Sequence, residues 1–259
     1  YYENTAAVTP RERAEAVASA IRIAETNGQS AAGTYSTGIG MQALLNSRGL
    51  AAYYRGTLAE FSITTTAPTS TGWTKKTSPD VREINSEDLA ERAARIATRS
   101  REPREIPPGS YATILEPAAV LDLVGFMFYD FSGQAVRDQR SFLTGRIGTK
   151  LFGENINISD DVYHPLQFGA PFDGEGVCRK ALPLVERGVV KNLTYARATA
   201  KAMGTEPTGH GFPLPNEWGE FPTNIVFTGD THSINEMIAS TTRGILVTRL
   251  WYIREVDPY

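Results

Sequence analysis

The sequence of 259 residues has few of the side chains on which common chemistries depend. It contains one cysteine, Cys178, which excludes a disulfide within the chain and fits a reducing compartment. The longest apolar stretch, residues 120–128, is interrupted by Asp122 and is much shorter than the roughly 20 residues of a membrane span. The first residues are neither basic nor apolar, so no signal peptide is predicted. We expect a cytoplasmic protein without a membrane partner.

An excess of charge of one sign is also absent. The chain has 26 Lys and Arg against 29 Asp and Glu, a net charge of -3 and an isoelectric point near 5.7. Because nucleic-acid affinity comes mainly from Lys and Arg that neutralise phosphates, we expect no nucleic-acid partner. The apolar content of 41% is typical of a globular protein with a real core.

Histidine is scarce, which limits metal chemistry. Only His164, His210 and His232 are present, and none has helical spacing from another. A catalytic zinc needs about three protein ligands and an open position for water. The H-E-x-x-H and G-x-S-x-G patterns are also missing. We therefore predict no metal site and no catalytic residue in this chain taken alone, and we interpret Cys178 as a small buried residue.

Local signals define the first hundred residues. Thr9-Pro10-Arg11-Glu12 is a capping box that predicts a helix ending near Asn27-Gly28. A second helix is predicted from Asn85 or Ser86 to about Thr98. Between them we expect antiparallel strands over residues 33–67 and a loop over 68–79. Gly38 and Gly40 match a loose dinucleotide-binding fingerprint, which requires a helix directly after the glycines. The residues that follow are too few for such a helix, so a glycine turn is favoured. The inward face of the first helix is predicted to hold Ala14, Val17, Ala18, Ile21 and Ala24.

The charged, proline-rich residues 101–109 are the best domain boundary. We predict an α+β protein, with a mixed α/β domain over 1–107 and a mainly antiparallel β domain with a few helices over 108–259. The chain does not begin with Met and its last apolar run stops near the end, so truncation at both ends is expected. Expected elements of the second domain are a strand over 111–115, a helix over 117–128, a hairpin of 181–186 and 189–194, helices over 195–203 and from Ser233, and a strand over 245–253.

The segment Phe172-Asp173-Gly174-Glu175-Gly176-Val177 places two acids and two glycines just before the predicted hairpin. Adjacent acids in glycine-rich turns more often cap the backbone than bind a ligand. We favour a structural turn, and a substrate-contacting loop is the alternative. The same reasoning applies to Asp160-Asp161.

Eight segments in order resemble the TldD/PmbA family, in which PmbA is also called TldE, once labelled modulators of DNA gyrase and now regarded as peptidases. The similarity covers nearly the whole chain. The segments are Asn46-Ser47-Arg48-Gly49-Leu50, Thr71-Gly72-Trp73, Pro108-Gly109-Ser110-Tyr111 with Leu115-Glu116-Pro117, Ser141-Phe142-Leu143 with Gly145-Arg146-Ile147-Gly148, Phe172-Asp173-Gly174-Glu175-Gly176, Glu186-Arg187-Gly188-Val189-Val190, Thr208-Gly209-His210, and residues 244–251.

The resemblance implies a zinc helix in the active TldD-type member, which carries H-E-x-x-x-H and is completed by a later Cys. The corresponding stretch here, residues 121–130, contains no His. This departure is what the PmbA/TldE type would show, so the resemblance implies a metal-free subunit that shapes the chamber of a zinc-bearing TldD-type partner in a heterodimer, or else a homodimer. Zinc is expected only in that partner, and the substrate is a peptide. Candidate substrate contacts are Asp173, Glu175, Gly176, Thr208, Gly209 and His210.

Two alternatives stay open. The chain could be a peptidase that is active by itself, with a site drawn from Asp173, Glu175, His210 and Cys178. It could also be a protein-binding regulator, in the sense of the older gyrase-modulator label. In the metal-free subunit that the resemblance implies, an antiparallel edge such as residues 245–253 is expected to bind an extended peptide by strand addition.

Overall fold

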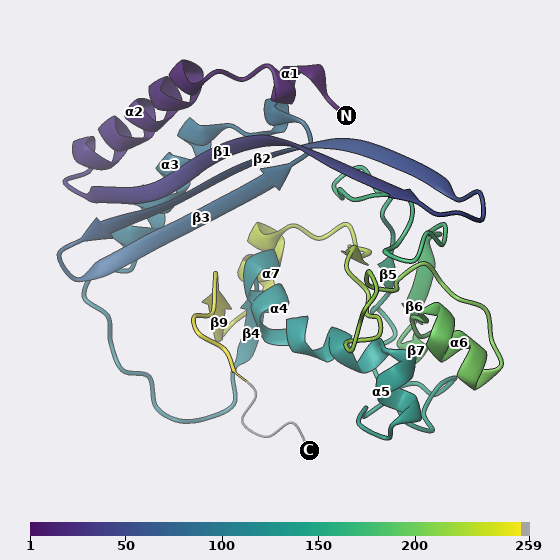
Figure 1. Cartoon of the computed structure of the whole chain (residues 1–259). Coiled ribbons are helices and arrows are strands. Elements are labelled where there is room, and N and C mark those ends of the chain that lie inside the picture. Colours follow the sequence, from purple (N-terminus) through teal and green to yellow (C-terminus); the bar gives the residue numbers. More distant parts are fainter. Residues whose placement is uncertain (255–259) are drawn as a thin grey trace. The chain divides into compact units, whose positions relative to one another are not determined.

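The computed structural model describes residues 1–254, which form two compact units (Figure 1). Unit 1 comprises Tyr1–Ala43, Tyr53–Pro108 and Pro165–Ala170. Unit 2 comprises Leu44–Ala52, Gly109–His164 and the chain from Pro171 onward. Helices accompany antiparallel sheets in the chain, so the α+β prediction is confirmed. No described helix combines the length and the apolarity needed to cross a bilayer.

Unit 1 is a three-stranded sheet with helices packed against it. The strand order is β1-β2-β3, and β2 pairs antiparallel with β3. Phe61 and Ile63 of the central strand pack against small residues of the helices, chiefly Ala20, Ala90 and Ala93. The elements are α1 (Glu3–Ala6), α2 (Pro10–Thr26), β1 (Ser30–Leu45), β2 (Ala51–Ala67), β3 (Ser70–Ser78), the 3-10 helix η1 (Val81–Glu83) and α3 (Ser86–Arg99).

The starts of α2 and α3 confirm the predicted caps. Thr9 and Glu12 form the capping box of α2, and the Asn85 side chain accepts backbone N–H bonds at the start of α3. The predicted inward face of α2 is only partly correct, because Ala20 and Ala24 are its buried residues whereas Ile21 is 40% exposed. Small residues let the helix approach the sheet closely, which leaves the larger Ile21 on its flank.

Two predictions for unit 1 are wrong. Residues 68–79 are not a loop, because Ser70–Ser78 form β3, whose Thr-rich sequence pairs with β2 in the register Thr65↔Gly72. Gly38 and Gly40 are not in a turn, because they lie inside the long strand β1. The turn between β1 and β2 is formed instead by residues 46–49, where the Asn46 side chain accepts the N–H groups of Arg48 and Leu50.

Unit 2 contains two sheets joined by long irregular segments. Four antiparallel strands follow the order β7-β6-β5-β8, and β4 pairs with β9 in parallel. The core of unit 2 is aliphatic and aromatic, with Phe131, Leu143 and Leu184 fully buried. The elements are β4 (Ala112–Leu115), α4 (Pro117–Val124), the 3-10 helix η2 (Gly125–Phe131), α5 (Gly133–Arg137), β5 (Ile158–Asp160), β6 (Leu182–Glu186), β7 (Val189–Val190), α6 (Arg197–Met203), β8 (Ile225–Phe227), α7 (Ile234–Ser240) and β9 (Gly244–Val247).

The predicted hairpin of unit 2 is confirmed, with positive φ at both Arg187 and Gly188, although its second strand is shorter than expected. The helix predicted to reach Phe128 ends at Val124 and continues as the 3-10 helix η2. The strand expected over residues 245–253 is limited to β9 and pairs in parallel with β4. It is therefore not the antiparallel edge that was expected to receive a peptide.

Candidate functional site

The six candidate substrate-contact residues lie on two loops of unit 2 that touch each other. Gly174 donates its N–H to the carbonyl of Gly211, at 2.9 Å. A Cβ added at Gly209 would lie 2.8 Å from the carbonyl oxygen of Cys178, and φ at Gly209 is +79°. Only glycine tolerates both conditions without strain. The fold thus joins the 172–177 loop and the 208–211 loop, which are well separated in the sequence.

Asp173 is buried and its carboxylate is fully used by backbone donors. One oxygen, Oδ1, accepts the N–H groups of Glu175 and Val177 at 2.9 and 2.8 Å. The other, Oδ2, accepts the N–H of Gly211 at 2.8 Å. These bonds are those of the structural turn that the sequence favoured. Contact between Asp173 and a substrate stays a prediction.

Glu175 and Gly176 also have local structural partners. The Oε2 atom of Glu175 accepts the N–H of Arg197 at 2.7 Å, at the start of α6. The N-cap residue of α6, Ala196, makes no side-chain cap bond, so Glu175 supplies that bond from another loop. Gly176 has φ +78°, and a Cβ there would contact the side chains of Leu44 and Leu50.

The centre of the site is Asp160, the last residue of β5, which is fully buried. Its Oδ2 accepts the N–H groups of Thr223 and Asn224, each at 2.7 Å. Its Oδ1 accepts a 2.6 Å hydrogen bond from Nη2 of Arg179. The same Oδ1 lies 3.1 Å from Nε2 of His210, close enough for an ion pair, although the ring is not aligned for a hydrogen bond.

The surroundings of Asp160 keep it ionised. Burial alone would raise the pKa of this carboxyl, but His210, Arg179 and the N–H of Asn224 outweigh burial and lower the pKa to about 2. The His210 side chain is completely buried. Its Nδ1 lies 2.9 Å from Oγ1 of Thr208. The carboxylate, the guanidinium and the imidazole together form one buried cluster, which we call the Asp160 cluster.

The row Thr208–His210–Asp160 has the spacing of a nucleophile, a base and an orienting acid. It lacks the other requirements of such a relay. The Thr208 hydroxyl already accepts the N–H of Tyr195 at 2.7 Å, and the carboxylate of Asp160 also accepts a hydrogen bond from Arg179. A nucleophile needs access to a substrate, whereas the imidazole here is enclosed by protein. This geometry suits a structural role better than nucleophilic catalysis.

Sequence reasoning did not find the partners of Asp160, nor a further buried carboxylate, Glu220. The Glu220 carboxylate accepts bonds from the Ser132 hydroxyl and the Gln134 N–H through Oε1, and from the Thr199 hydroxyl through Oε2. It thereby ties α5 to α6. Burial, together with the charge of Glu220, raises the pKa of Tyr195. No motif marks Glu220 or the partners of Asp160, because the residues that meet come from distant segments.

Cys178 is exposed, so its interpretation as a buried residue is wrong. Its segment makes only an isolated bridge between Phe172 and Cys178, not a packed strand. His232 is also exposed and lies 3.8 Å from Asp230. Within residues 1–254, no group of three or more His, Cys, Asp or Glu side chains could hold a metal ion.

The helix that follows Leu115-Glu116-Pro117 does not fit a zinc ion. Leu121 and Leu123 of α4 are 58% and 51% exposed, and neither can ligate a metal. The Oδ2 atom of Asp122 accepts the N–H of Leu250 at 3.0 Å. Zinc prefers imidazole and thiolate ligands arranged around an open position, and α4 presents aliphatic side chains instead.

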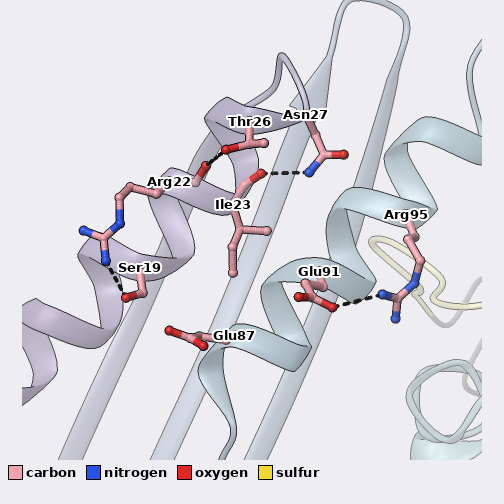
Figure 2. Close-up of a pocket in the computed structure, with 8 residues that line it drawn as sticks. All are labelled: Ser19, Arg22, Ile23, Thr26, Asn27, Glu87, Glu91 and Arg95. Atoms are coloured by element: carbon pink, nitrogen blue, oxygen red, sulfur yellow. Dashed lines mark hydrogen bonds and ion pairs between the residues drawn. The ribbon is translucent and has the colours of Figure 1, made fainter.

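Unit 1 has a separate polar cleft of about 500 Å³ between α2 and α3 (Figure 2). In it, Arg22 donates to Ser19 at 2.7 Å, and Arg95 donates to Glu91 at 3.4 Å. Both signs of charge line the cleft, so it favours no ligand of one charge. None of the predicted site residues lies in it.

Comparison with known proteins gives the family. Residues 108–259 match the PmbA/TldA metallopeptidase C-terminal domain, and residues 4–101 match the central domain of the same family. The chain therefore belongs to the PmbA/TldA metallopeptidase family.

Curated relatives include proteins named as metalloproteases. An uncharacterised protein of Methanocaldococcus jannaschii is 30% identical over 212 residues, which are 79% of this chain and 49% of the relative. A metalloprotease of the same organism is 28% identical over 168 residues, 62% of this chain and 36% of the relative. The chain thus spans about half or less of the length of these relatives.

Solved structures share the fold. A putative modulator of a DNA gyrase from Thermotoga maritima has a TM-score of 0.86 and 24% identity, with 96% of this chain and 59% of that chain covered. TldE from Thermococcus kodakarensis has a TM-score of 0.83 and 24% identity, with 97% and 59% covered. At this identity the likeness concerns the fold.

Proposed function

We propose that this chain is a metal-free subunit of a TldD/TldE-type metallopeptidase assembly. In this proposal a zinc-bearing partner carries the catalytic site, and this chain shapes the chamber that peptides enter. The observation that carries the proposal is the surface of α4, where Leu121 and Leu123 stand in the stretch in which a TldD-type member would have its histidines. Membership of a metallopeptidase family supplies the reaction class.

The construction of the two candidate loops supports a shaping role. Asp173 and Glu175 accept backbone N–H groups, and Thr208 is bonded to His210, whose ring lies beside Asp160. Loops fixed by buried bonds keep their shape when a ligand approaches. A wall of this kind would limit which peptides reach the partner's metal. A cytoplasmic location and a heterodimeric or homodimeric state belong to the same proposal.

Metal analysis and reconstitution test this function. The purified chain should hold far less than one zinc per molecule and should not hydrolyse unstructured peptides. Hydrolysis should appear when a TldD-type subunit is added. As a control, a partner with its helix glutamate changed to glutamine should leave the mixture inactive, because that residue would be the general base. One tightly bound zinc per molecule of this chain would contradict the proposal.

The two alternatives give different results in the same experiment. Steady turnover by the isolated chain after treatment with a chelator, lost in Glu175→Gln, would favour a peptidase active by itself. A stable complex with a protein other than a peptidase subunit would favour a regulator. The regulator is retained as a candidate because the fold is similar to that of a structure described as a putative modulator of a DNA gyrase.

A further inference from the structure

The irregular loop over residues 212–219 of unit 2 exposes two large apolar side chains. Leu214 is 73% exposed and Trp218 is 82% exposed. The half-buried rings of Phe212 and Phe221 lie at the base of this loop, with centroids 4.9 Å apart, and the ring of Tyr129 lies 4.9 Å from that of Phe221. Apolar side chains gathered in this way, unlike single ones, mark a surface that contacts a ligand or another molecule.

Hydrogen bonds at its base and within it hold the 212–219 loop in one shape. Gly211 and Glu220, which flank the loop, form an antiparallel bridge. The Nδ2 atom of Asn216 donates to the carbonyl of Gly219 at 2.7 Å, and its Oδ1 accepts the N–H of Trp218 at 2.8 Å. A side chain presented by a fixed loop has less conformational entropy to lose when it binds a ligand.

The 212–219 loop adjoins both loops that carry the candidate substrate contacts. It follows the 208–211 loop directly in the chain. Gly174 of the 172–177 loop donates its N–H to the carbonyl of Gly211, and a Cβ added at Gly174 would collide with the backbone of Pro213. A peptide that lies along the two candidate loops would therefore also reach the 212–219 loop.

In the sequence around this loop, charge has one sign. Glu217 precedes Trp218, is exposed, and makes no ion pair in the part of the chain that the structure describes. No Lys or Arg occurs between Lys201 and Arg243, whereas that stretch contains several acids. A cation is attracted both by a carboxylate and by the face of an indole ring. The loop therefore suits a ligand that carries an apolar group beside a positive charge.

We propose that the 212–219 loop selects peptides in which a large apolar or aromatic residue stands next to a Lys or Arg. Trp218 and Leu214 contact the apolar side chain, and Glu217 pairs with the cation. This inference rests on the proposed function, because it names the class of peptide that the chain would admit to the chamber. A peptide is favoured over a folded partner because the loop is continuous with the candidate substrate loops.

Calorimetry with the isolated chain tests this selection. A Gly/Ser peptide that contains one Phe-Lys pair should bind more tightly than the same peptide with Ser in place of Phe or Glu in place of Lys. Trp218→Ala should weaken its binding about tenfold or more. Glu217→Gln should weaken it about two- to fivefold, as expected for an exposed ion pair. Trp251→Ala is the matched control, because Trp251 is 76% exposed and lies outside the loop.

Fluorescence shows whether the peptide reaches Trp218. The emission of this residue is the difference between the native chain and Trp218→Phe. The Phe-Lys peptide should shift it to shorter wavelength, because water leaves the indole. Emission of a buried indole before any peptide is added would mean that another part of the protein or a second copy covers Trp218, and would overturn the proposal. Equal binding of the three peptides would also overturn it, as would unchanged binding by a Trp218→Ala chain that circular dichroism shows to be folded.

Failure of this inference and failure of the proposed function are distinguishable, because the binding test needs neither zinc nor a partner. A mixture with a TldD-type subunit that hydrolyses none of the peptides would contradict the proposed function, whatever the isolated chain binds. An active mixture in which the native chain and Trp218→Ala give the same relative rates for the three peptides would contradict the inference alone.

Discussion

At the scale of single residues, unit 2 depends on buried carboxylates. Asp160, Asp173 and Glu220 are buried, and each accepts bonds from donors on distant segments. Such groups are costly when unpaired, so each one specifies where its donors must lie. Asp160 is the one among these three that has an arginine and a histidine within 4 Å of its carboxylate in the described structure, Arg179 and His210.

Acid should weaken the protein through Asp160. Its pKa in the folded chain is about 2, below the value of 3.8 for a free carboxyl. The ionised Asp160 therefore adds about 2 kcal/mol to the free energy of unfolding above about pH 4. This contribution is lost as the pH falls toward 2. Urea unfolding at a series of pH values measures this dependence. An unchanged free energy of unfolding across that window would contradict the assignment.

The substitution Asp160→Asn should lower the free energy of unfolding by about 3–5 kcal/mol, because it leaves a buried guanidinium without its anion. Asp161→Asn is the matched control. Asp161 is only half-buried, and its Oδ1 accepts the N–H of Tyr163, a bond that an amide oxygen can keep. We expect less than about 1 kcal/mol of change there. Equal losses in the two variants would argue against the Asp160 cluster.

At the scale of elements, caps and turns were well predicted from sequence and long-range features were not. The capping boxes at Thr9 and Ser233 and the turn at Gly188 depend on residues within a few positions. The extent of β1 and the existence of β3 depend on pairing with β2, which local patterns do not encode.

The candidate site shows the same limit. The motifs located the two loops, but the bonds that join them could not be predicted. Arg179, His210 and Asn224 lie 19, 50 and 64 residues after Asp160, and no periodicity connects them. Local sequence therefore identified Asp173 as a turn residue but gave no sign that a buried ion pair lay beside it.

The glycine at position 176 should be more sensitive than an ordinary turn glycine. Gly176 and Gly145 have similar φ values, +78° and +71°, but only Gly176 has neighbours, Leu44 and Leu50, within contact distance of an added Cβ. We expect Gly145→Ala to cost about 1 kcal/mol, from backbone strain alone. Gly176→Ala should cost about 2–4 kcal/mol, because overpacking adds to that strain. Thermal unfolding of both variants measures the difference, and equal shifts would contradict the contact with the leucines.

At the scale of the whole molecule, the segment that links the two units is expected to be sensitive to proteolysis. Residues 101–110 are all exposed and contain no helix or strand, and Arg101 and Arg104 lie among them. Exposed irregular segments are the preferred sites of proteolysis. Brief trypsin treatment should therefore cut first after these arginines, as judged by mass spectrometry of the fragments. An initial cut after Arg48, in the β1–β2 turn, would show that the hairpin opens more readily.

The hydrogen-bond partners of Asp160 also affect the order in which the protein folds during synthesis. During translation the carboxylate leaves the ribosome 64 residues before Asn224, whose N–H is one of its partners. Until then the nascent chain must keep Asp160 hydrated, since an ionised carboxylate without its partners is not stable in an apolar interior. Unit 2 can close around this residue only when the segment containing Asn224 has been synthesised, so its folding must follow the synthesis of that segment.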